Sequence, residues 1–138
     1  MTMRERYLAL TEKRKIPEVI VVEGKDDTAN LKRYYEVDTY ETRGSAINQD
    51  DLERIATLQE LRGVIVFTDP DYNGERIRKI IMQEIPQAKH AFLNRGEAVP
   101  KSKTKGRSLG VEHASFEDLE KALSGLVGSY EDEYFFDI

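Results

Sequence analysis

The sequence predicts an α/β fold in which a mostly parallel, four-stranded sheet carries helices on both faces. Short runs of β-branched residues alternate with longer segments whose apolar residues recur at helical spacing. Such continuous apolar runs are typical of strands buried on both faces. The alternation of strands and helices is typical of parallel sheets joined by crossover helices. A chain of 138 residues is long enough to bury this core within one domain.

The first strand and helix follow an N-terminal extension. We expect residues 1–16 to form this extension, as a short helix or an arm that ends at Pro17. Residues 18–22 (EVIVV) are a β-branched run that Gly24 interrupts, so they are predicted to be a buried strand. Residues 25–35 carry acidic side chains in their first turn, which favours a helix there.

The middle of the chain repeats this pattern. Residues 37–42 alternate as a strand does, and residues 64–68 (VIVFT) form another buried strand. Between them, Asn48 or Asp50 can cap a helix over residues 50–61. The inward face of this helix is expected to contain Leu52, Ile55, Ala56 and Leu61.

The last part of the chain combines a helix, a short strand, a loop and a final helix. Residues 74–85 are predicted to be helical up to Pro86, and residues 89–93 to be a fourth strand. Residues 94–109 are rich in turn formers and poor in apolar residues, which predicts a long loop before a helix over 117–126. The inward faces of the two helices are expected to contain Ile77, Ile80, Ile81 and Ile85, and Leu119, Leu123 and Leu126.

Composition excludes several classes of protein. The chain contains no cysteine, which excludes disulfides, cysteine zinc sites, iron–sulfur ligation and thiol catalysis. No apolar run approaches the roughly 18–20 residues of a membrane span. The N-terminus lacks the apolar core of a signal peptide. We therefore expect a cytoplasmic protein with no membrane partner.

Charge is distributed unevenly along a chain whose net charge is −5. Residues 89–107 contain six Lys or Arg and one Glu, whereas residues 112–138 contain eight acidic residues and one Lys. This polarity suits an anionic partner that meets one face, although basic loops are also common on ordinary solvated surfaces. Arg76 and Arg78 either hold phosphate or cover the surface. The candidate phosphate contacts are Arg76, Arg95, Lys101, Lys103, Lys105 and Arg107.

Carboxylates follow two of the predicted strands. Glu23 follows the first strand, and Asp69 and Asp71 follow the strand over residues 64–68. Ligands of parallel α/β sheets bind at the carboxyl ends of the strands. Three anions at one point are costly without a cation, and hard oxygen ligands suit Mg²⁺ or Mn²⁺. The sequence therefore predicts a divalent-metal site at Glu23, Asp69 and Asp71.

Two other interpretations of the aspartates stay open at this point. The DPDYNG segment is also rich in turn formers, so it can be a simple strand-to-helix turn. It matches the first positions of an EF-hand loop, but Ile80 stands where such a loop needs Glu, and a strand precedes it. The histidines are less informative. His90 is expected to be packed in a strand, and His113 to be a core residue, a phosphate ligand or a proton shuttle.

The two acidic motifs resemble those of the Toprim domain, which topoisomerases, bacterial primases and some nucleases share. That domain has a strand ending in Glu-Gly, here VVEG at 21–24, and D-x-D-x-x-G, here within DPDYNGERI at 69–77. Further segments resemble the ribonuclease M5 family, the endoribonucleases that mature precursor 5S ribosomal RNA. These segments are VIVVEGKDDTA (19–29), ETRGSAI (41–47), GVIVFTDPDYNGERIRK (63–79), KHAFL (89–93) and GVEHAS (110–115).

The resemblance implies a specific activity. The family cuts both strands of a double-helical stalk in precursor 5S rRNA, needs Mg²⁺, and is assisted by a ribosomal protein that binds 5S rRNA. Glu23 would be a metal ligand or general acid/base, and Asp69 and Asp71 metal ligands, while Gly74 lets the backbone approach. The residues expected around them are Asp27, Gly74, Glu112 and His113.

The resemblance also implies a domain organisation. A Toprim catalytic domain would span residues 17–126, and residues 127–138 would be an acidic tail or a linker to a C-terminal RNA-binding region. We expect a monomer. Arg43 departs from the family pattern, which has Asn there. The alternatives are a Toprim activity on DNA, either nuclease or primase-like, and a non-catalytic nucleic-acid-binding module.

Overall fold

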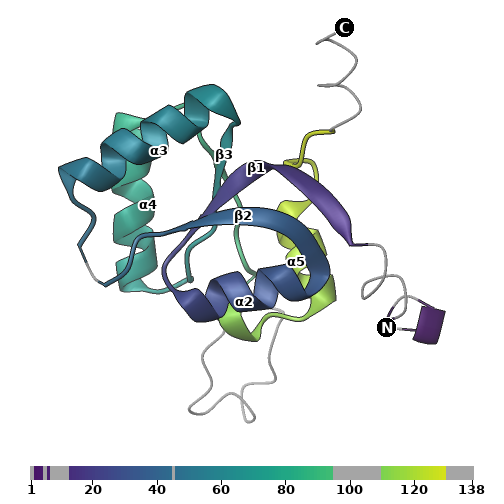
Figure 1. The fold of residues 1–138 in the computed structure, drawn as a ribbon. Coiled ribbons are helices and arrows are strands. Elements are labelled where there is room, and N and C mark those ends of the chain that lie inside the picture. Colours follow the sequence, from purple (N-terminus) through teal and green to yellow (C-terminus); the bar gives the residue numbers. More distant parts are fainter. Residues whose placement is uncertain (1, 5, 7–12, 45, 95–109, 130–138) are drawn as a thin grey trace, which may run out of the picture.

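The computed structural model describes residues 2–4, 6, 13–44, 46–94 and 110–129. They form a four-stranded sheet in the order β2-β1-β3-β4, with every neighbouring pair parallel (Figure 1). The strands are β1 (Arg14–Val22), β2 (Tyr35–Glu41), β3 (Val64–Val66) and β4 (Lys89–His90). The predicted parallel α/β fold is therefore confirmed.

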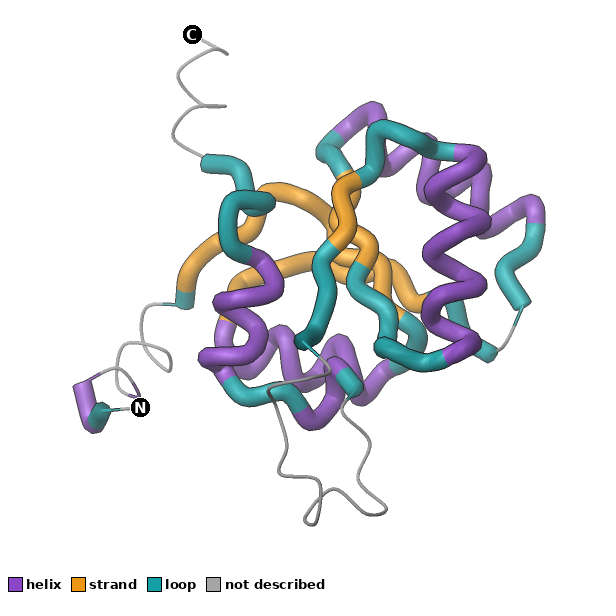
Figure 2. Tube along the Cα trace, turned by 180° about the vertical axis from the view of Figure 1, so that it is seen from behind, coloured by secondary structure: helices purple, strands orange, loops and turns teal. Residues whose placement is uncertain are grey.

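Helices cover both faces of the sheet, as the sequence predicts. They are α2 (Lys25–Tyr34), α3 (Gln49–Leu61), α4 (Tyr72–Glu84) and α5 (Phe116–Leu123), with a short 3₁₀ helix η2 (Val111–His113) before α5. Helices α3 and α4 lie on one side of the sheet, and α2 and α5 on the other (Figures 1 and 2). Within the described residues, no helix is both long enough and apolar enough to cross a membrane.

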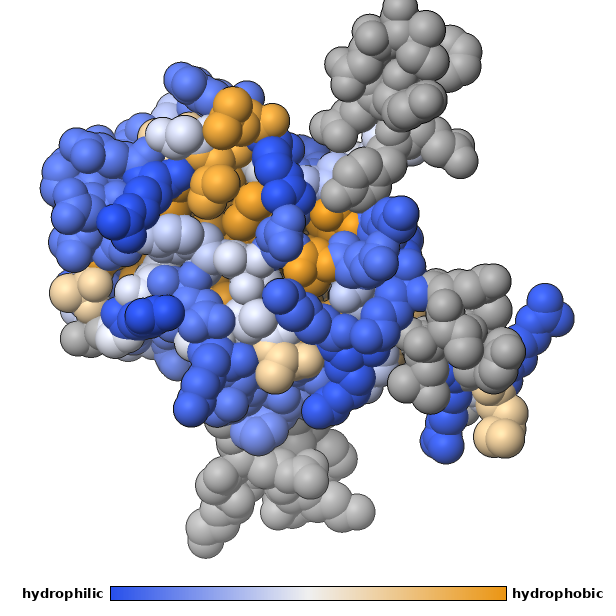
Figure 3. Space-filling view, in the orientation of Figure 1, coloured by the Kyte–Doolittle hydropathy of each residue, from blue (hydrophilic) through white to orange (hydrophobic). Residues whose placement is uncertain are grey.

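The core consists of two clusters, one on each face. Successive side chains of β1 point to opposite faces. Ile20 and Val22 pack in the cluster that contains Leu31 of α2 and Leu119 of α5. Val21 packs in the other cluster, with residues of α3 and α4. The face drawn in Figure 3 is mostly hydrophilic, with apolar side chains visible in the region of β1 and β3.

The expected element boundaries differ from the structure at several ends. Strand β1 begins at Arg14, so the last three residues of the expected extension belong to the sheet. Pro17 lies inside this strand, at an irregularity in the pairing between Lys15 and Val19, where its missing N–H is tolerated. Strands β3 and β4 and helix α5 are shorter than expected.

Two predicted inward positions are wrong. Leu61 is 74% exposed, because it is five residues from Ala56 and six from Ile55, which takes it off their stripe on α3. Ile80 of α4 is only partly buried, whereas Arg78 on the same helix is 3% exposed. The α3 cap is Asn48, whose side chain accepts a hydrogen bond from the Asp51 backbone N–H.

Candidate active site

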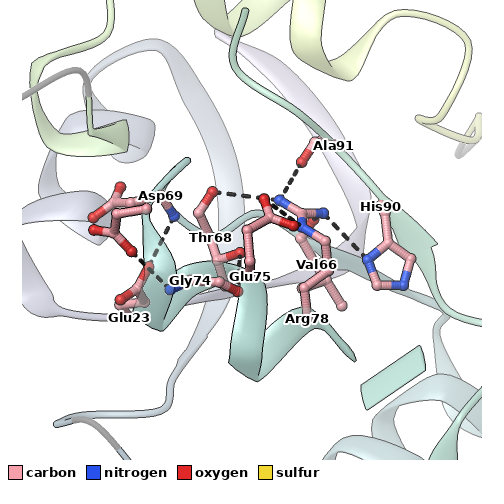
Figure 4. A network of polar contacts seen from close by, with 10 residues as sticks. Glu23, Val66, Thr68, Asp69, Gly74, Glu75, Arg78, His90 and Ala91 are labelled. Atoms are coloured by element: carbon pink, nitrogen blue, oxygen red, sulfur yellow. Dashed lines mark hydrogen bonds and ion pairs between the residues drawn. The ribbon is translucent and has the colours of Figure 1, made fainter. Parts of the chain in front are cut away.

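The first feature of the site is the contact between the ends of β1 and β3. Glu23 directly follows β1, and Asp69 comes three residues after β3. Because the two strands are parallel neighbours, both residues lie at the same edge of the sheet. The Asp69 backbone N–H donates to Glu23 Oε1 at 2.8 Å (Figure 4). Asn73 Nδ2 donates to Glu23 Oε2 at 3.2 Å. The predicted convergence of Glu23 and Asp69 is thus present.

Asp71 and Gly74 form the start of α4. Asp71 is the N-cap of this helix, and its Oδ1 accepts the Gly74 backbone N–H at 2.7 Å. Thr68 Oγ1 donates to the Gly74 carbonyl oxygen at 3.0 Å. A Cβ at position 74 would lie 2.0 Å from the Asp69 carbonyl oxygen, so only glycine fits. The close approach expected of Gly74 is therefore confirmed, and it sets Asp69 against the helix.

Asp69 is held from its other side by η2. The Val111 backbone N–H donates to Asp69 Oδ1 at 2.8 Å. Asn30 of α2, which is 3% exposed, fixes η2 by donating from Nδ2 to the Val111 and Ala114 carbonyl oxygens at 2.8 and 2.9 Å. The sequence reasoning did not identify Asn30. The sequence offers one indication that Asn30 is buried: it lies on the same face of α2 as Asp27 and Leu31, which are also buried.

The turn that follows β2 also contacts this edge. The Arg43 backbone N–H donates to the Glu23 carbonyl oxygen at 2.9 Å. Arg43 has a φ of 57°, in the left-handed region where Asn is strongly enriched. This left-handed backbone conformation explains why the family pattern has Asn at this position.

Several carboxylates influence one another electrostatically. Burial raises the pKa of Glu23, hydrogen bonds from Asp69 and Asn73 oppose this, and the charges of Asp69 and Asp71 raise it further. Burial also raises the pKa of Asp27 to about 6, assisted by the charges of Asp69, Glu23 and Glu112. We call Glu23, Asp27, Asp69, Asp71 and Glu112 the carboxylate cluster. Concentrated negative charge of this kind favours a bound cation.

The donor set fits Mg²⁺ or Mn²⁺ in its chemistry. All five members of the cluster offer carboxylate oxygens, which hard divalent cations prefer. Among the described residues, no three acidic, histidine or cysteine side chains are already arranged to hold a metal ion. This is compatible with Mg²⁺, which typically uses one or two carboxylates and completes its octahedron with water and substrate phosphate.

The other predicted site residues have varied positions. Arg76 is exposed on α4, with Nη2 3.5 Å from Asn73 Oδ1. The His113 side chain is 63% exposed, and its Nε2 lies 3.5 Å from Glu112 Oε1, which excludes the core role. Five of the expected phosphate contacts lie outside the described residues, namely Arg95, Lys101, Lys103, Lys105 and Arg107.

Arg78 is buried and makes structural contacts. Its guanidinium donates to the Ala91 carbonyl oxygen at 2.8 Å, and to those of Val66 and Thr68 at 3.4 Å (Figure 4). A second contact joins Nη1 to His90 Nδ1 at 3.2 Å. Arg78 thus ties α4 to the ends of β3 and β4, and its burial contradicts the surface role that was one of its two predicted roles.

Replacing Asp27 with Asn is expected to stabilise the protein when no divalent ion is present. In the unfolded chain this carboxyl titrates near 3.8, and in the folded protein near 6. The free energy of unfolding of the wild type therefore decreases as the pH rises through this interval, and it stays at the lower value at higher pH. Asn removes the charge and keeps an acceptor for the Gly24 N–H, which Asp27 Oδ2 accepts at 3.0 Å. The gain should be about 1–3 kcal/mol at pH 7.5 and near zero below pH 4.

Urea unfolding of both proteins across this pH range measures the effect. Asp26→Asn is the matched control, because Asp26 is an exposed acid in the same first turn of α2. At pH 7.5 this control should lose a few tenths of a kcal/mol, because it removes a favourable charge from the N-terminal end of the helix dipole. If Asp27→Asn raised the free energy of unfolding by the same amount at every pH, the raised pKa of Asp27 would be contradicted.

Comparison with known proteins identifies the family. The Toprim domain family matches residues 18–98. Ribonuclease M5 of Streptococcus pneumoniae (strain ATCC BAA-255 / R6) is 67% identical over 126 residues, which cover 91% of this chain and 68% of that protein. The chain belongs to the ribonuclease M5 family. The expected membership in this family is therefore confirmed.

Two further proteins agree with this assignment. Ribonuclease M5 of Lactococcus lactis subsp. lactis (strain IL1403) is 66% identical over 119 residues, covering 86% of this chain and 56% of that protein. A solved small TOPRIM domain protein from Bacillus stearothermophilus superimposes with a TM-score of 0.60 at 25% identity, covering 80% of this chain and 88% of that one. The chain thus spans about two thirds or less of these two ribonuclease M5 relatives.

Proposed function

We propose that this ribonuclease M5 family member cuts both strands of a double-helical stalk in precursor 5S rRNA to produce mature ends. Its cofactor in this proposal is Mg²⁺, for which Mn²⁺ can substitute. The observation that carries the proposal is the 2.8 Å hydrogen bond from the Asp69 backbone N–H to the Glu23 carboxylate, which joins the ends of two neighbouring strands that carry acidic residues. Arrangements of this kind at the carboxyl edge of a parallel sheet suit phosphoryl chemistry with a divalent ion.

Glu23, Asp69 and Asp71 would hold the ion. Bound Mg²⁺ would supply positive charge at the phosphodiester and lower the pKa of a water nucleophile. Asp69 and Asp71 are oriented by the backbone N–H groups of Val111 and Gly74. These hydrogen bonds fix the orientation of both carboxylates, which suits them to binding a cation.

Glu23 is suited to a further role in proton transfer. Burial and neighbouring charge raise its pKa above the ordinary value, towards the working pH. A general acid or base is most effective when its pKa lies close to that pH. Asp69 N–H and Asn73 Nδ2 hold its two oxygens in place. In our proposal Glu23 therefore either binds the ion or moves a proton to or from the reacting oxygen.

The basic residues would hold the RNA by its backbone. Duplex RNA is recognised mainly by shape and through phosphates and 2′-hydroxyls, so lysine and arginine contacts suffice. Arg76 is exposed at the start of α4, close to Asn73 and the cluster. In the proposal it acts with Arg95, Lys101, Lys103, Lys105 and Arg107, which follow β4 in the sequence.

Replacing Lys101, Lys103 and Lys105 together with Ala should weaken RNA binding and reduce its salt dependence. Each lost phosphate contact lowers the magnitude of the slope of log K against log salt concentration by about 1. The slope of the triple variant should therefore be smaller than that of the wild type by about 2–3. Titrations of duplex RNA at several salt concentrations measure this slope.

A second triple variant controls for the change in net charge. Lys13, Lys15 and Lys32 line a groove near the amino ends of β1 and β2, at the opposite edge of the sheet from the carboxylate cluster. Replacing these three with Ala should leave the slope nearly unchanged. Equal slopes for both triple variants would remove residues 101–105 from the RNA interface.

Cleavage of precursor 5S rRNA tests the proposed function. The proposal includes a monomer acting in the cytoplasm, where bacterial rRNA matures, with a 5S-binding ribosomal protein as helper. The chain and a full-length relative are compared with Mg²⁺, with and without that helper, on precursor 5S rRNA and on duplex DNA of the same sequence. Specific cuts in the RNA are expected. Cuts in the DNA alone would favour another Toprim activity, and binding without cuts a non-catalytic module.

A further inference from the structure

A second feature lies directly beside the carboxylate cluster. A pocket of about 250 Å³ is lined by Thr68, Pro70, Glu75, Arg78, Phe92 and Leu93. Pro70 stands between Asp69 and Asp71, so the pocket begins where the proposed metal ligands are attached. The segment over residues 68–75 therefore contributes both to the pocket, through Thr68, Pro70 and Glu75, and to the proposed metal site, through Asp69 and Asp71. After Leu93 and Asn94 the sequence continues into the lysine-rich segment.

One of the side chains that line the pocket is the aromatic ring of Phe92. Phe92 is 56% exposed, so part of its side chain is open to a ligand. The Arg78 guanidinium carbon lies 4.0 Å from the centre of its ring, so one face of the ring rests on a cation. Arg78 is itself anchored by the carbonyl oxygens of Val66, Thr68 and Ala91. Phe92 is thus a supported platform and not a loose surface residue.

The wall of the pocket carries an acceptor. Glu75 lies one turn N-terminal to Arg78 on α4, with Oε1 4.0 Å from Arg78 Nε. This Nε has no hydrogen-bond partner among the described residues. The Arg78 charge therefore attracts the Glu75 carboxylate towards the pocket, but the two groups do not form a hydrogen bond. An aromatic face and a carboxylate on one rim match a nucleobase, which has a π-face for stacking and N–H donors along its edge.

We propose that this pocket binds one unstacked base of the RNA substrate, next to the cleaved phosphate. The base stacks on Phe92 and donates from its edge to Glu75. The inference rests on the proposed function, since it places the pocket beside the reacting phosphate. It adds a local requirement to that function: the duplex is held by its backbone, while one nucleotide must leave the stack, which is easiest at a bulge, mismatch or duplex end.

A double-mutant cycle between protein and RNA tests the proposal. Abasic nucleotides are introduced one position at a time along both strands of the stalk of precursor 5S rRNA, and each RNA is combined with wild type, Phe92→Leu and Phe92→Tyr. Affinity is measured in EDTA, and cleavage is measured separately with Mg²⁺. Phe92→Leu should weaken binding of base-containing RNA about tenfold to a hundredfold. It should have almost no effect on the RNA that lacks the one base, and Phe92→Tyr should behave as wild type.

Controls separate the pocket from general effects. Leu61→Ala removes an exposed apolar side chain far from the pocket and should change neither measurement. Equal losses for Phe92→Leu with every abasic RNA would overturn the pocket, even where wild type cleaves as proposed. If no RNA is cut, the proposed function fails, and the affinities in EDTA still decide whether Phe92 binds a base.

Discussion

Replacing Asp69 or Asp71 with Asn is expected to lower the rate of RNA cleavage at least about a thousandfold, with RNA affinity nearly unchanged. A bound cation supplies several kcal/mol of transition-state stabilisation, and about 4 kcal/mol corresponds to this factor. Asn has nearly the same shape as Asp and keeps an Oδ1 acceptor for the Val111 or Gly74 N–H. The substitution therefore removes charge from the cluster and leaves its geometry in place.

Single-turnover cleavage and equilibrium binding of the same RNA measure the two quantities. Asp50→Asn is a suitable control, because Asp50 is an exposed acid in the first turn of α3, outside the cluster. It should cleave at the wild-type rate. Turnover of Asp69→Asn and Asp71→Asn at the same rate as this control would contradict the metal assignment.

Gly74→Ala is expected to lower the free energy of unfolding by at least about 2 kcal/mol and to remove most of the cleavage activity. The added Cβ would lie 2.0 Å from the Asp69 carbonyl oxygen and 3.0 Å from its backbone carbon and nitrogen. These are backbone atoms, which cannot rotate away as a flexible side chain does. Either α4 or residue 69 must move, and movement of Asp69 breaks its contact with Glu23.

Urea unfolding followed by circular dichroism measures the loss of stability. Gly24→Ala provides the matched comparison, because a Cβ at position 24 would meet nothing within 4 Å and its φ of −148° suits any residue. This control should lose less than about 1 kcal/mol, as expected for Ala in place of Gly at a helix N-cap. Equal unfolding free energies for both variants would mean that the close approach at Gly74 is relaxed in solution.

The sequence predicted the framework of the site because strand ends obey simple rules. Continuous β-branched runs place buried strands, and the carboxyl ends of parallel neighbours meet at one edge. Glu23 and Asp69 could therefore be placed together before their hydrogen bond was known. The glycine in D-x-D-x-x-G could likewise be assigned to a close backbone approach.

Other features could not be predicted, because they depend on tertiary contacts that no local pattern encodes. Arg78 reads as a surface arginine on a helix, yet the ends of β3 and β4 offer three carbonyl oxygens that compensate its burial. Asn30 is likewise buried because it satisfies carbonyl oxygens some 80 residues along the chain. The start of β1 at Arg14 was missed because Pro17 ordinarily excludes a strand interior, and a local irregularity accommodates it here.

Cleavage of a phosphorothioate RNA tests most directly whether the carboxylate cluster acts through a divalent ion. Sulfur replaces one non-bridging oxygen at the mapped cut, and rates are compared in Mg²⁺ and in the softer Mn²⁺. Hard Mg²⁺ binds sulfur poorly, so we predict slow cleavage of one sulfur diastereomer in Mg²⁺ and recovery in Mn²⁺. The contradicting result is a cleavage rate of the phosphorothioate RNA that is reduced equally in Mg²⁺ and in Mn²⁺ while unmodified RNA is cleaved normally in each. It would mean that no metal ion held by Glu23, Asp69 and Asp71 contacts the phosphate.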